Sequence, residues 1–220
     1  MKKYLIALLV IAIIVIAASQ SKNSDSIQSR WEQAMLIRKN VIEKKFGIKF
    51  NNGWVPKMEF KSSDTISHEI IFYNGRYVEE TGTLRINERF RGANIPAVGD
   101  LVTKLPDSVC LLIDHELGHA LTDQISHRLS GKTWPAETSF ETYWEVIEIR
   151  ILTEGVADFF RNMLSSDTTS SVKNLPNNSQ DELWQTKKWI YDGGYWTVKP
   201  IIEKYGEKGI EYIINHLFHY

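Results

Sequence analysis

The stretch Asp114-His115-Glu116-Leu117-Gly118-His119 restricts the fold of this chain more than any other. If it is helical, the four-residue spacing puts the imidazoles of His115 and His119 on one face, about 40° apart around the axis. Two neutral ring nitrogens at that spacing can share one cation. Glu116 lies roughly 100° from His115 around the same helix. The pattern therefore predicts a metal-binding helix with a carboxylate beside the metal, able to reach a metal-bound water without occupying the metal itself.

The residues around this motif also favour a helix. An apolar set falls on the side opposite the histidines: Val109, Cys110, Ile113, Leu117, Ala120 and Leu121. Pro106 suits a first turn, and Asp107 or Ser108 can accept hydrogen bonds from its free amides. We predict a helix of about five turns or more. Because Gly118 inside it costs roughly 1 kcal/mol relative to alanine, we expect another part of the chain to approach the backbone there.

A second stretch offers a third metal ligand. Such a ligand matters because the first motif alone arises by chance in roughly one chain of this length in a hundred. Thr138 and Glu141 have the spacing of a capping box, and the many large apolar residues that follow predict a long buried helix. Glu154 and Asp158 lie one turn apart on that helix. A buried carboxylate needs a partner, and a dication shared with the two histidines would satisfy both.

The two stretches together resemble the active-site helices of the gluzincin superfamily of zinc metallopeptidases, which includes thermolysin. The resemblance rests on the first motif and on the sequence Glu-Gly-Val-Ala-Asp from Glu154 to Asp158. It covers these two helices and not the whole chain. It implies that zinc is bound by His115, His119 and Glu154. It also implies that Glu116 is the general base and that Asp158 orients a ligand histidine through its other ring nitrogen.

These residues have two other interpretations. The metzincin variant is excluded because it requires a histidine six positions after His119, where this chain has Ile125. His127 is out of register for that role. The other interpretation is a structural cluster of ion pairs without a metal.

A tyrosine near the C-terminal end is the last candidate residue. The stretch Tyr191-Asp192-Gly193-Gly194-Tyr195 resembles the segment in several gluzincins where a tyrosine followed by glycine reaches the site. A phenol can donate a hydrogen bond to a developing oxyanion without competing for the metal. We assign this role to Tyr191, with Tyr195 as the second choice. A purely structural role is the alternative for each.

The N-terminal end predicts export. Met1-Lys2-Lys3 precedes an apolar run from Tyr4 to Ala18, which as a helix spans roughly 22 Å, short of a hydrocarbon core of about 30 Å. We interpret residues 1–19 as a removed signal peptide; the alternative is a retained anchor that attaches the protein to the membrane through residues 4–18. No cysteine directly follows the run, which excludes a lipoprotein anchor. Residues 20–26 form a linker, and the catalytic part is expected to be extracytoplasmic, whether secreted, periplasmic or anchored facing outward.

Residues 27–220 are predicted to form one α+β domain, in which a small antiparallel sheet precedes a mainly helical, zincin-like metalloprotease part. With 43% hydrophobic residues and a net charge of −1, the chain has enough apolar material for one core. An amphipathic helix is predicted at residues 27–46, ending at Gly47. Residues 181–220 are expected to be helical around an interruption at residues 191–195.

The sheet is predicted from short stretches of alternating residues between residues 48 and 102. Strands are expected at residues 55–61, 68–73 and 83–87. In gluzincins a sheet of this kind offers an edge strand to an extended substrate, and pairing at such an edge is a general way of binding peptide. We assign the edge to residues 83–87.

Composition narrows the function. The charges are balanced and interspersed, so there is no basic stripe for nucleic acid. Cys110 is expected to be a buried, inert thiol. Three functions are compatible with the motifs: an exported zinc peptidase acting on peptide or protein substrates, a zinc hydrolase of another amide or ester, and a non-catalytic zinc-containing binding protein. Glu116 argues against the third, because a purely structural metal site has no need of that carboxylate.

Overall fold

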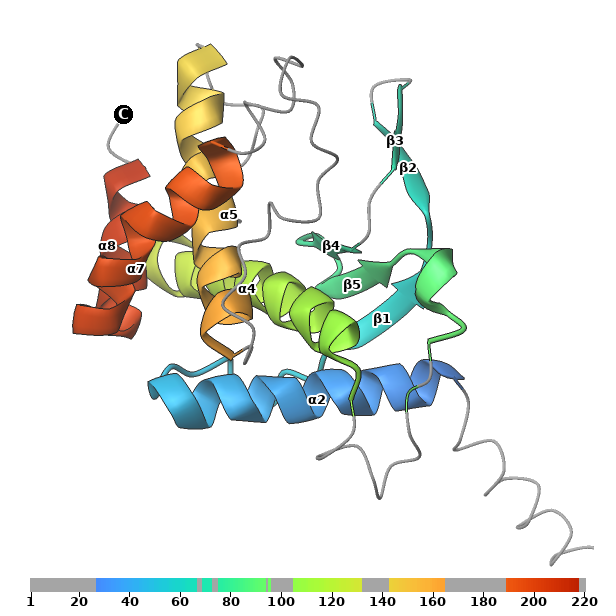
Figure 1. The fold of residues 1–220 in the computed structure, drawn as a ribbon. Coiled ribbons are helices and arrows are strands. Elements are labelled where there is room, and N and C mark those ends of the chain that lie inside the picture. Colours follow the sequence, from blue (N-terminus) through green and yellow to red (C-terminus); the bar gives the residue numbers. More distant parts are fainter. Residues whose placement is uncertain are drawn as a thin grey trace, which may run out of the picture.

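The computed structural model in Figure 1 describes residues 27–66, 69–72, 75–93, 95, 105–131, 143–164 and 189–217. The signal peptide or anchor at residues 1–19, the linker at residues 20–26 and the capping box at Thr138 and Glu141 lie outside these ranges. Among the described helices, none combines the length and the apolar character needed to span a bilayer. The described elements are mostly helices with a small sheet. The α+β class is therefore confirmed.

The first helix, α2 (Ile27–Phe46), has the predicted bounds. Its buried residues recur at helical spacing: Trp31, Ala34, Met35 and Ile42. Gly47 ends it with a φ of 68°, in the left-handed region that favours glycine. In Figure 1, α2 runs beneath α4 (Asp107–Ser130) and β1 (Lys57–Phe60), and it packs against both.

The sheet is mixed, so the prediction of an antiparallel sheet is wrong. The strand order is β1-β5-β4, with β5 (Thr83–Ile86) parallel to β1 and antiparallel to β4 (Gly75–Val78). The parallel pairing arises because a separate antiparallel hairpin lies between β1 and β4 in the sequence. It is formed by β2 (Ser63–Ile66) and β3 (Glu69–Phe72) and rises away from the sheet in Figure 1. After this excursion the chain returns through β4, and β5 comes back parallel to β1. A short 3-10 turn, η1 (Glu88–Phe90), follows β5.

The central position of β5 corrects a second prediction. Residues 83–87 were expected to be the edge of the sheet, but β5 pairs on both sides. Its alternate residues Leu84 and Ile86 are fully buried. In the described three-stranded sheet the edges are therefore β1 and β4.

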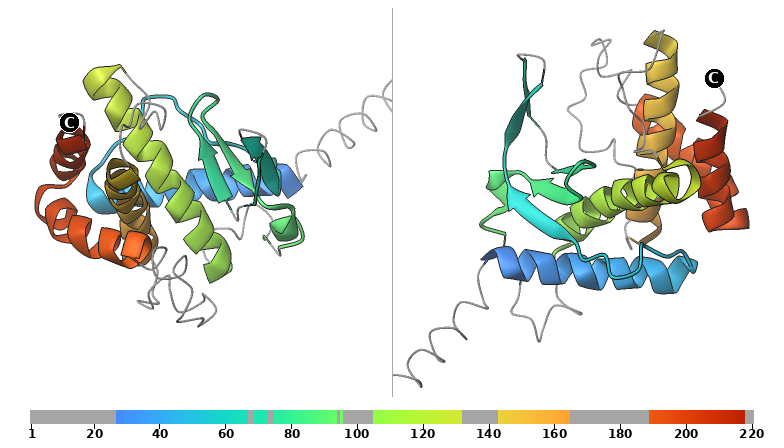
Figure 2. Two further views of the ribbon diagram at one scale, coloured as in Figure 1. Left: turned by 90° about the horizontal axis from the view of Figure 1, so that it is seen from above. Right: turned by 180° about the vertical axis from the view of Figure 1, so that it is seen from behind.

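Helix α5 (Tyr143–Leu164) lies in the middle of the described helices, as predicted. It packs against α4 on one side and against α7 (Gly194–Tyr205) and α8 (Glu207–Leu217) on the other, and Figure 2, left, shows it nearly end-on. A π-helical turn, η5 (Trp189–Gly193), leads directly into α7. The predicted interruption at residues 191–195 is therefore a widened helical turn that continues into α7, a feature often found at functional sites.

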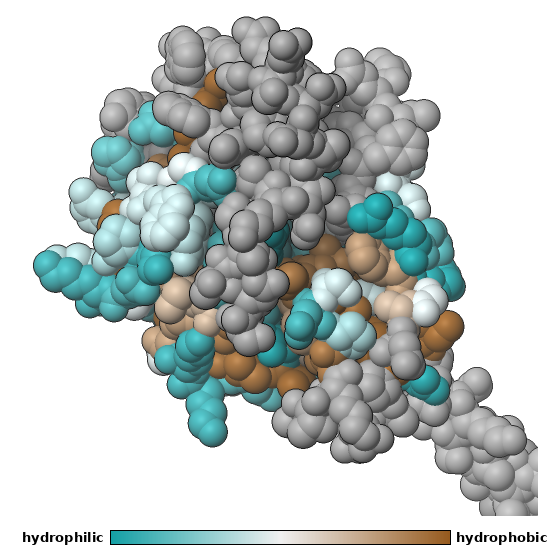
Figure 3. Space-filling model, in the orientation of Figure 1, coloured by the Kyte–Doolittle hydropathy of each residue, from teal (hydrophilic) through white to brown (hydrophobic). Residues whose placement is uncertain are grey.

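One hydrophobic core cluster joins these elements. It includes large side chains from α2, β5 and the helices, among them Trp31, Leu84, Ile113, Phe159 and Ile213. In Figure 3 hydrophobic residues gather in the lower half of the face shown, in the region of α2, with polar residues around them. This packing fixes α4 between α2, the sheet and α5.

Candidate metal centre

Helix α4 carries the first motif, and its apolar side is oriented as predicted. The buried residues on that side are Val109, Ile113, Leu117, Ala120 and Leu121. Cys110 is only partly buried, which corrects the prediction of full burial, although burial still raises the pKa of its thiol. The helix begins after Pro106, and no side chain caps it, contrary to the role predicted for Asp107 and Ser108.

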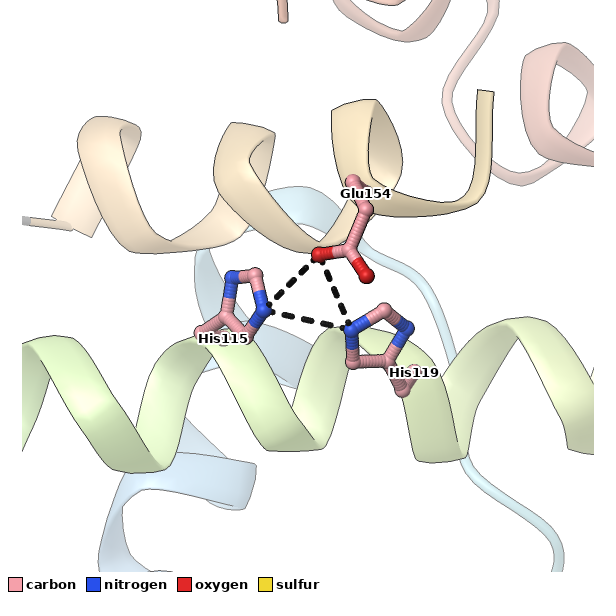
Figure 4. A group of neighbouring side chains, drawn as sticks. All are labelled: His115, His119 and Glu154. Atoms are coloured by element: carbon pink, nitrogen blue, oxygen red, sulfur yellow. Dashed lines mark hydrogen bonds and ion pairs between the residues drawn. The ribbon is translucent and has the colours of Figure 1, made fainter. Parts of the chain in front are cut away.

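Three side chains of ligand type from two helices converge at one point, as Figure 4 shows. On α4, the Nε2 atoms of His115 and His119 are 3.2 Å apart. On α5, Glu154 Oε2 lies 3.2 Å from His115 Nε2 and 3.6 Å from His119 Nε2. The structure therefore brings together the three residues proposed as ligands, which we call the triad.

The triad has the size that a small dication requires. Nitrogen and oxygen ligands at about 2.0–2.1 Å from a tetrahedral zinc ion lie about 3.3–3.4 Å from one another. The edges here are 3.2, 3.2 and 3.6 Å. Glu154 Oε2 is buried and faces the two histidine nitrogens, but it has no hydrogen bond of regular geometry among the described residues, although buried carboxylate oxygens normally have such a partner. Two imidazoles and one carboxylate also suit a divalent transition metal, so the residues present fit a metal ion.

A buried carboxylate orients one of the histidines. Asp158, fully buried on α5, lies with Oδ1 2.9 Å from His115 Nδ1. The same oxygen is 3.3 Å from Arg161 Nη1. With the proton of His115 on Nδ1 and donated to Asp158, the lone pair of Nε2 faces the centre of the triad. Asp158 therefore lies where the resemblance implies.

Charges within the triad determine its state without a metal. Burial acts against a charged imidazole, but the carboxylates of Asp158 and Glu154 outweigh burial and raise the pKa of His115 to about 10. Despite burial, Glu154 also raises the pKa of His119. Burial would raise the pKa of Glu154, yet the two histidines hold it well below its usual range. The metal-free triad is thus an ion-paired cluster, and a metal must displace protons to bind.

Glu116 is buried on α4 beside the triad. Its Oε2 atom has no hydrogen-bond partner. Burial raises the pKa of its carboxyl, while the charges of His115 and His119 act in the opposite direction. The carboxylate contacts β4, because Glu116 Oε1 lies against Gly75.

Tyr191 also reaches this region. It lies on η5, and its ring centroid is 6.3 Å from that of His115. The negative charge of Glu154, followed by burial, raises the pKa of its phenol, so the hydroxyl keeps its proton. Tyr195 instead packs its ring against Trp196 and lies under the ammonium group of Lys199. The structure therefore brings the first of the two predicted tyrosines to the site.

Glycines allow the helices around the site to approach closely. A Cβ atom added to Gly118 would lie 2.6 Å from Ala157 Cα, so α5 is the segment predicted to approach the backbone there. A Cβ atom added to Gly155 would lie 2.5 Å from the backbone of Gly194. The second contact joins α5 to the start of α7, directly after η5.

Sequence reasoning missed three residues around the site. Arg161 follows Asp158 by three positions, so helical spacing could have placed it on the same side of α5. Gly194 belongs to the glycine pair after Tyr191, and the sequence does not indicate that its backbone packs against α5. Gly75 lies just after the strand expected at residues 68–73, and no local pattern indicates that its backbone lies beside Glu116.

No family model, curated protein or solved structure matches this chain. The functional proposal therefore depends on the triad and its surroundings.

Proposed function

We propose that this chain is an exported zinc-dependent metallopeptidase of the gluzincin type, with a zincin-like domain at residues 27–220. The observation that carries the proposal is the triad, whose edges of 3.2 to 3.6 Å suit a tetrahedral zinc ion. Two histidines and one glutamate are zinc ligands in known peptidases, where the fourth position is left open for water. Export is supported by the apolar run at residues 4–18.

The chemistry divides between the metal and the chain. The residues that would hold the zinc ion are His115, His119 and Glu154. When bound, zinc lowers the pKa of a water molecule and polarises the scissile carbonyl. Glu116 accepts a proton from the attacking water and delivers it to the leaving amine. Because burial raises the pKa of Glu116, its carboxyl is better suited to both accepting and releasing a proton near neutral pH.

Two further residues complete the proposed mechanism. Tyr191 donates a hydrogen bond from its phenol to the oxyanion that develops on the carbonyl oxygen. The raised pKa of this phenol keeps it a donor. Asp158 holds the proton of His115 on Nδ1 and so fixes the direction of the opposite ring nitrogen.

Peptide or protein substrates are supported by the position of β4. This strand is an edge of the described sheet, and its residue Gly75 lies against Glu116. An extended peptide that pairs with an open strand edge is bound through its backbone. We therefore assign substrate pairing to β4 in place of residues 83–87.

Metal analysis of the full-length protein tests the triad. The comparison includes Glu154→Ala and, as a control, Glu148→Ala, because Glu148 is exposed on the same helix. We expect near-stoichiometric zinc in the wild type and the control, and much less in Glu154→Ala. Zinc that is unaffected by Glu154→Ala would place the third ligand elsewhere. No zinc in any of the three proteins would refute the proposal.

Hydrolysis of a mixed peptide library tests the activity. Glu116→Gln is expected to keep zinc and fold but to lose roughly 10²- to 10⁴-fold in turnover, because an amide cannot accept the proton. Turnover at the wild-type rate would refute the role of Glu116. Cleavage of other amides or esters in place of peptides would indicate the second function, and bound zinc without any hydrolysis would indicate the third.

A further inference from the structure

Strand β4 packs directly against the Glu116 carboxylate. A Cβ atom added to Gly75 would lie 2.5 Å from Glu116 Oε1 and 2.9 Å from its Cδ and Cγ. Non-bonded carbon atoms attract best at about 3.5–4.0 Å, so a side chain at position 75 and this carboxylate cannot occupy their present positions together. The carboxylate fills the space that any other residue at position 75 would need.

The strand is held in place and cannot move away from Glu116. Tyr77 of β4 pairs with Leu84 of the central strand β5, and the Leu84 side chain is fully buried. Tyr77 Oη also donates a buried hydrogen bond of 3.0 Å to Asp123 Oδ2. Asp123 lies two turns after Glu116 along α4, on the same side of the helix. Strand β4 is therefore held by backbone pairing with β5 along one edge and by a side-chain hydrogen bond to α4.

The carboxylate of Glu116 is the part that can move. It ends a side chain with several rotatable bonds, and its Oε2 atom has no hydrogen-bond partner among the residues that the structure describes. The backbone amide of Tyr77 forms a hydrogen bond with the Glu116 carboxylate. A methyl group at position 75 would therefore displace the carboxylate and leave the strand where it is.

We propose that Gly75 is a positioning residue for the general base, because its missing side chain leaves the space in which β4 holds the Glu116 carboxylate beside the triad. This inference rests on the proposed function. The methyl group of an alanine displaces the carboxylate by about 1 Å, and a misplacement of that size can cost roughly 10²-fold in rate. The metal ligands of the triad are residues of α4 and α5 other than Glu116. We therefore expect zinc binding to be unchanged.

The test compares Gly75→Ala with Gly92→Ala in the full-length, zinc-loaded protein. Gly92 is a matched control, because a Cβ atom added there meets no atom of the described residues within 4 Å. We expect kcat to fall roughly 100-fold in Gly75→Ala, with KM and zinc content unchanged, and all three values to be unchanged in Gly92→Ala. A wild-type kcat in Gly75→Ala would overturn the proposal.

A second background separates displacement of Glu116 from general damage to the fold. In Glu116→Ala protein the carboxylate and the Cγ and Cδ atoms that would lie 2.9 Å from a Cβ atom at position 75 are absent. Gly75→Ala is expected to lower kcat much less in this background than in the wild type. An equal loss in both backgrounds would indicate general damage and overturn the proposal.

The amide NMR signal of Tyr77 provides a readout that needs no turnover. Glu116→Ala is expected to shift this signal in the wild type and to shift it much less in Gly75→Ala protein, in which the carboxylate has already been displaced. Equal shifts in the two backgrounds would overturn the role of Gly75. If the wild type hydrolyses no peptide, the proposed function fails, but this comparison still decides whether Gly75 positions Glu116.

Discussion

Two close helix contacts support the site. One supports the half that contains the triad, and the other supports the half that contains Tyr191. At the α4/α5 contact, a Cβ atom on Gly118 would lie 2.6 Å from Ala157 Cα. At the α5/α7 contact, a Cβ atom on Gly155 would lie 2.5 Å from the backbone carbonyl of Gly194. The first contact joins the two helices that carry the triad. The second joins α5 to the helix that directly follows Tyr191, so it determines where the phenol lies.

The two contacts also differ in what surrounds them. Beside the α4/α5 contact lie buried charges, including Asp158 with its partners His115 and Arg161. The α5/α7 contact is mainly close backbone packing with apolar neighbours, such as the buried Val198. The geometry of the triad is thus supported by both the α4/α5 backbone contact and the buried charges beside it. The position of Tyr191 depends chiefly on the α5/α7 backbone contact. Metal binding and oxyanion stabilisation should therefore be separable by mutation.

The largest effect is expected from Gly118→Ala. The added methyl group meets the backbone of Ala157, which cannot rotate away, so the helices must separate. We expect a loss of roughly 3 kcal/mol in the free energy of unfolding, the upper end for overpacking. Zinc affinity should fall as well, because metal ligands tolerate changes of only about 0.2 Å. Urea unfolding and zinc competition measure the two effects.

Gly92→Ala is the control for this experiment, because within the described part of the chain its added methyl group meets no atom within 4 Å. It should retain both stability and zinc affinity. If Gly118→Ala kept the zinc affinity of the wild type, the α4/α5 contact would not control the triad, and the distinction between the two contacts would fail.

Local patterns in the sequence predicted α2, α4 and the histidine pair of the triad, whereas the resemblance implied Glu154 as the third ligand. The apolar spacing of α2 and the four-residue spacing of the histidines are properties of single helices, so no knowledge of the rest of the fold is needed. Gly118 was informative for the same reason: its cost within a helix predicted a close approach, and Ala157 makes it. The roles of these residues in catalysis stay predictions.

Non-local pairing could not be predicted in the same way. The sequence Thr83-Leu84-Arg85-Ile86 alternates, which indicates that one face is buried but not that the strand has neighbours on both sides. Strand β4 has four residues and begins at Gly75, a residue type that more often indicates a turn. The parallel pairing of β1 with β5 depends on the hairpin between them. For these reasons the sheet type, its edge and the role of Gly75 required the structure.

An intermediate effect is expected from Gly194→Ala. Its methyl group would clash with the carbonyl oxygen of Ile151 and with the backbone of Gly155. We expect a loss of roughly 2 kcal/mol in stability and, because η5 shifts with α7, roughly 10²-fold lower kcat. Zinc content should be unchanged, in contrast to Gly118→Ala. Thermal or urea unfolding, zinc analysis and peptide hydrolysis together check this pattern.

The neighbouring residue provides the matched control. Gly193 has φ −61° and ψ −42°, a helical conformation, and a Cβ atom added there meets none of the described residues within 4 Å. Gly193→Ala should therefore be neutral or stabilising by up to about 1 kcal/mol. Loss of zinc in Gly194→Ala but not in Gly193→Ala would show that the α5/α7 contact also controls the triad.

The smallest effect is expected from Arg161→Gln, which tests the ion pairs of the α4/α5 half. Arg161 contacts Asp158 Oδ1, the oxygen that also binds His115. Outer partners of metal ligands are worth 10- to 100-fold in metal affinity. Arg161 acts one step further out and its Nε atom has no partner, so we expect the lower end, roughly tenfold or about 1.4 kcal/mol.

The contrast with Asp158→Asn and with an exposed arginine decides how this result is interpreted. Asp158→Asn should weaken zinc binding more than Arg161→Gln, because it changes the group that binds His115 directly. Arg150→Gln, at an exposed position of α5, should leave zinc affinity unchanged. Arg161→Lys keeps the positive charge and should recover part of the loss. If Arg161→Gln instead lowered kcat at constant zinc affinity, the guanidinium would act on Tyr191, because the charge of Arg161 also reaches the Tyr191 phenol. The two halves of the site would then be coupled through α5.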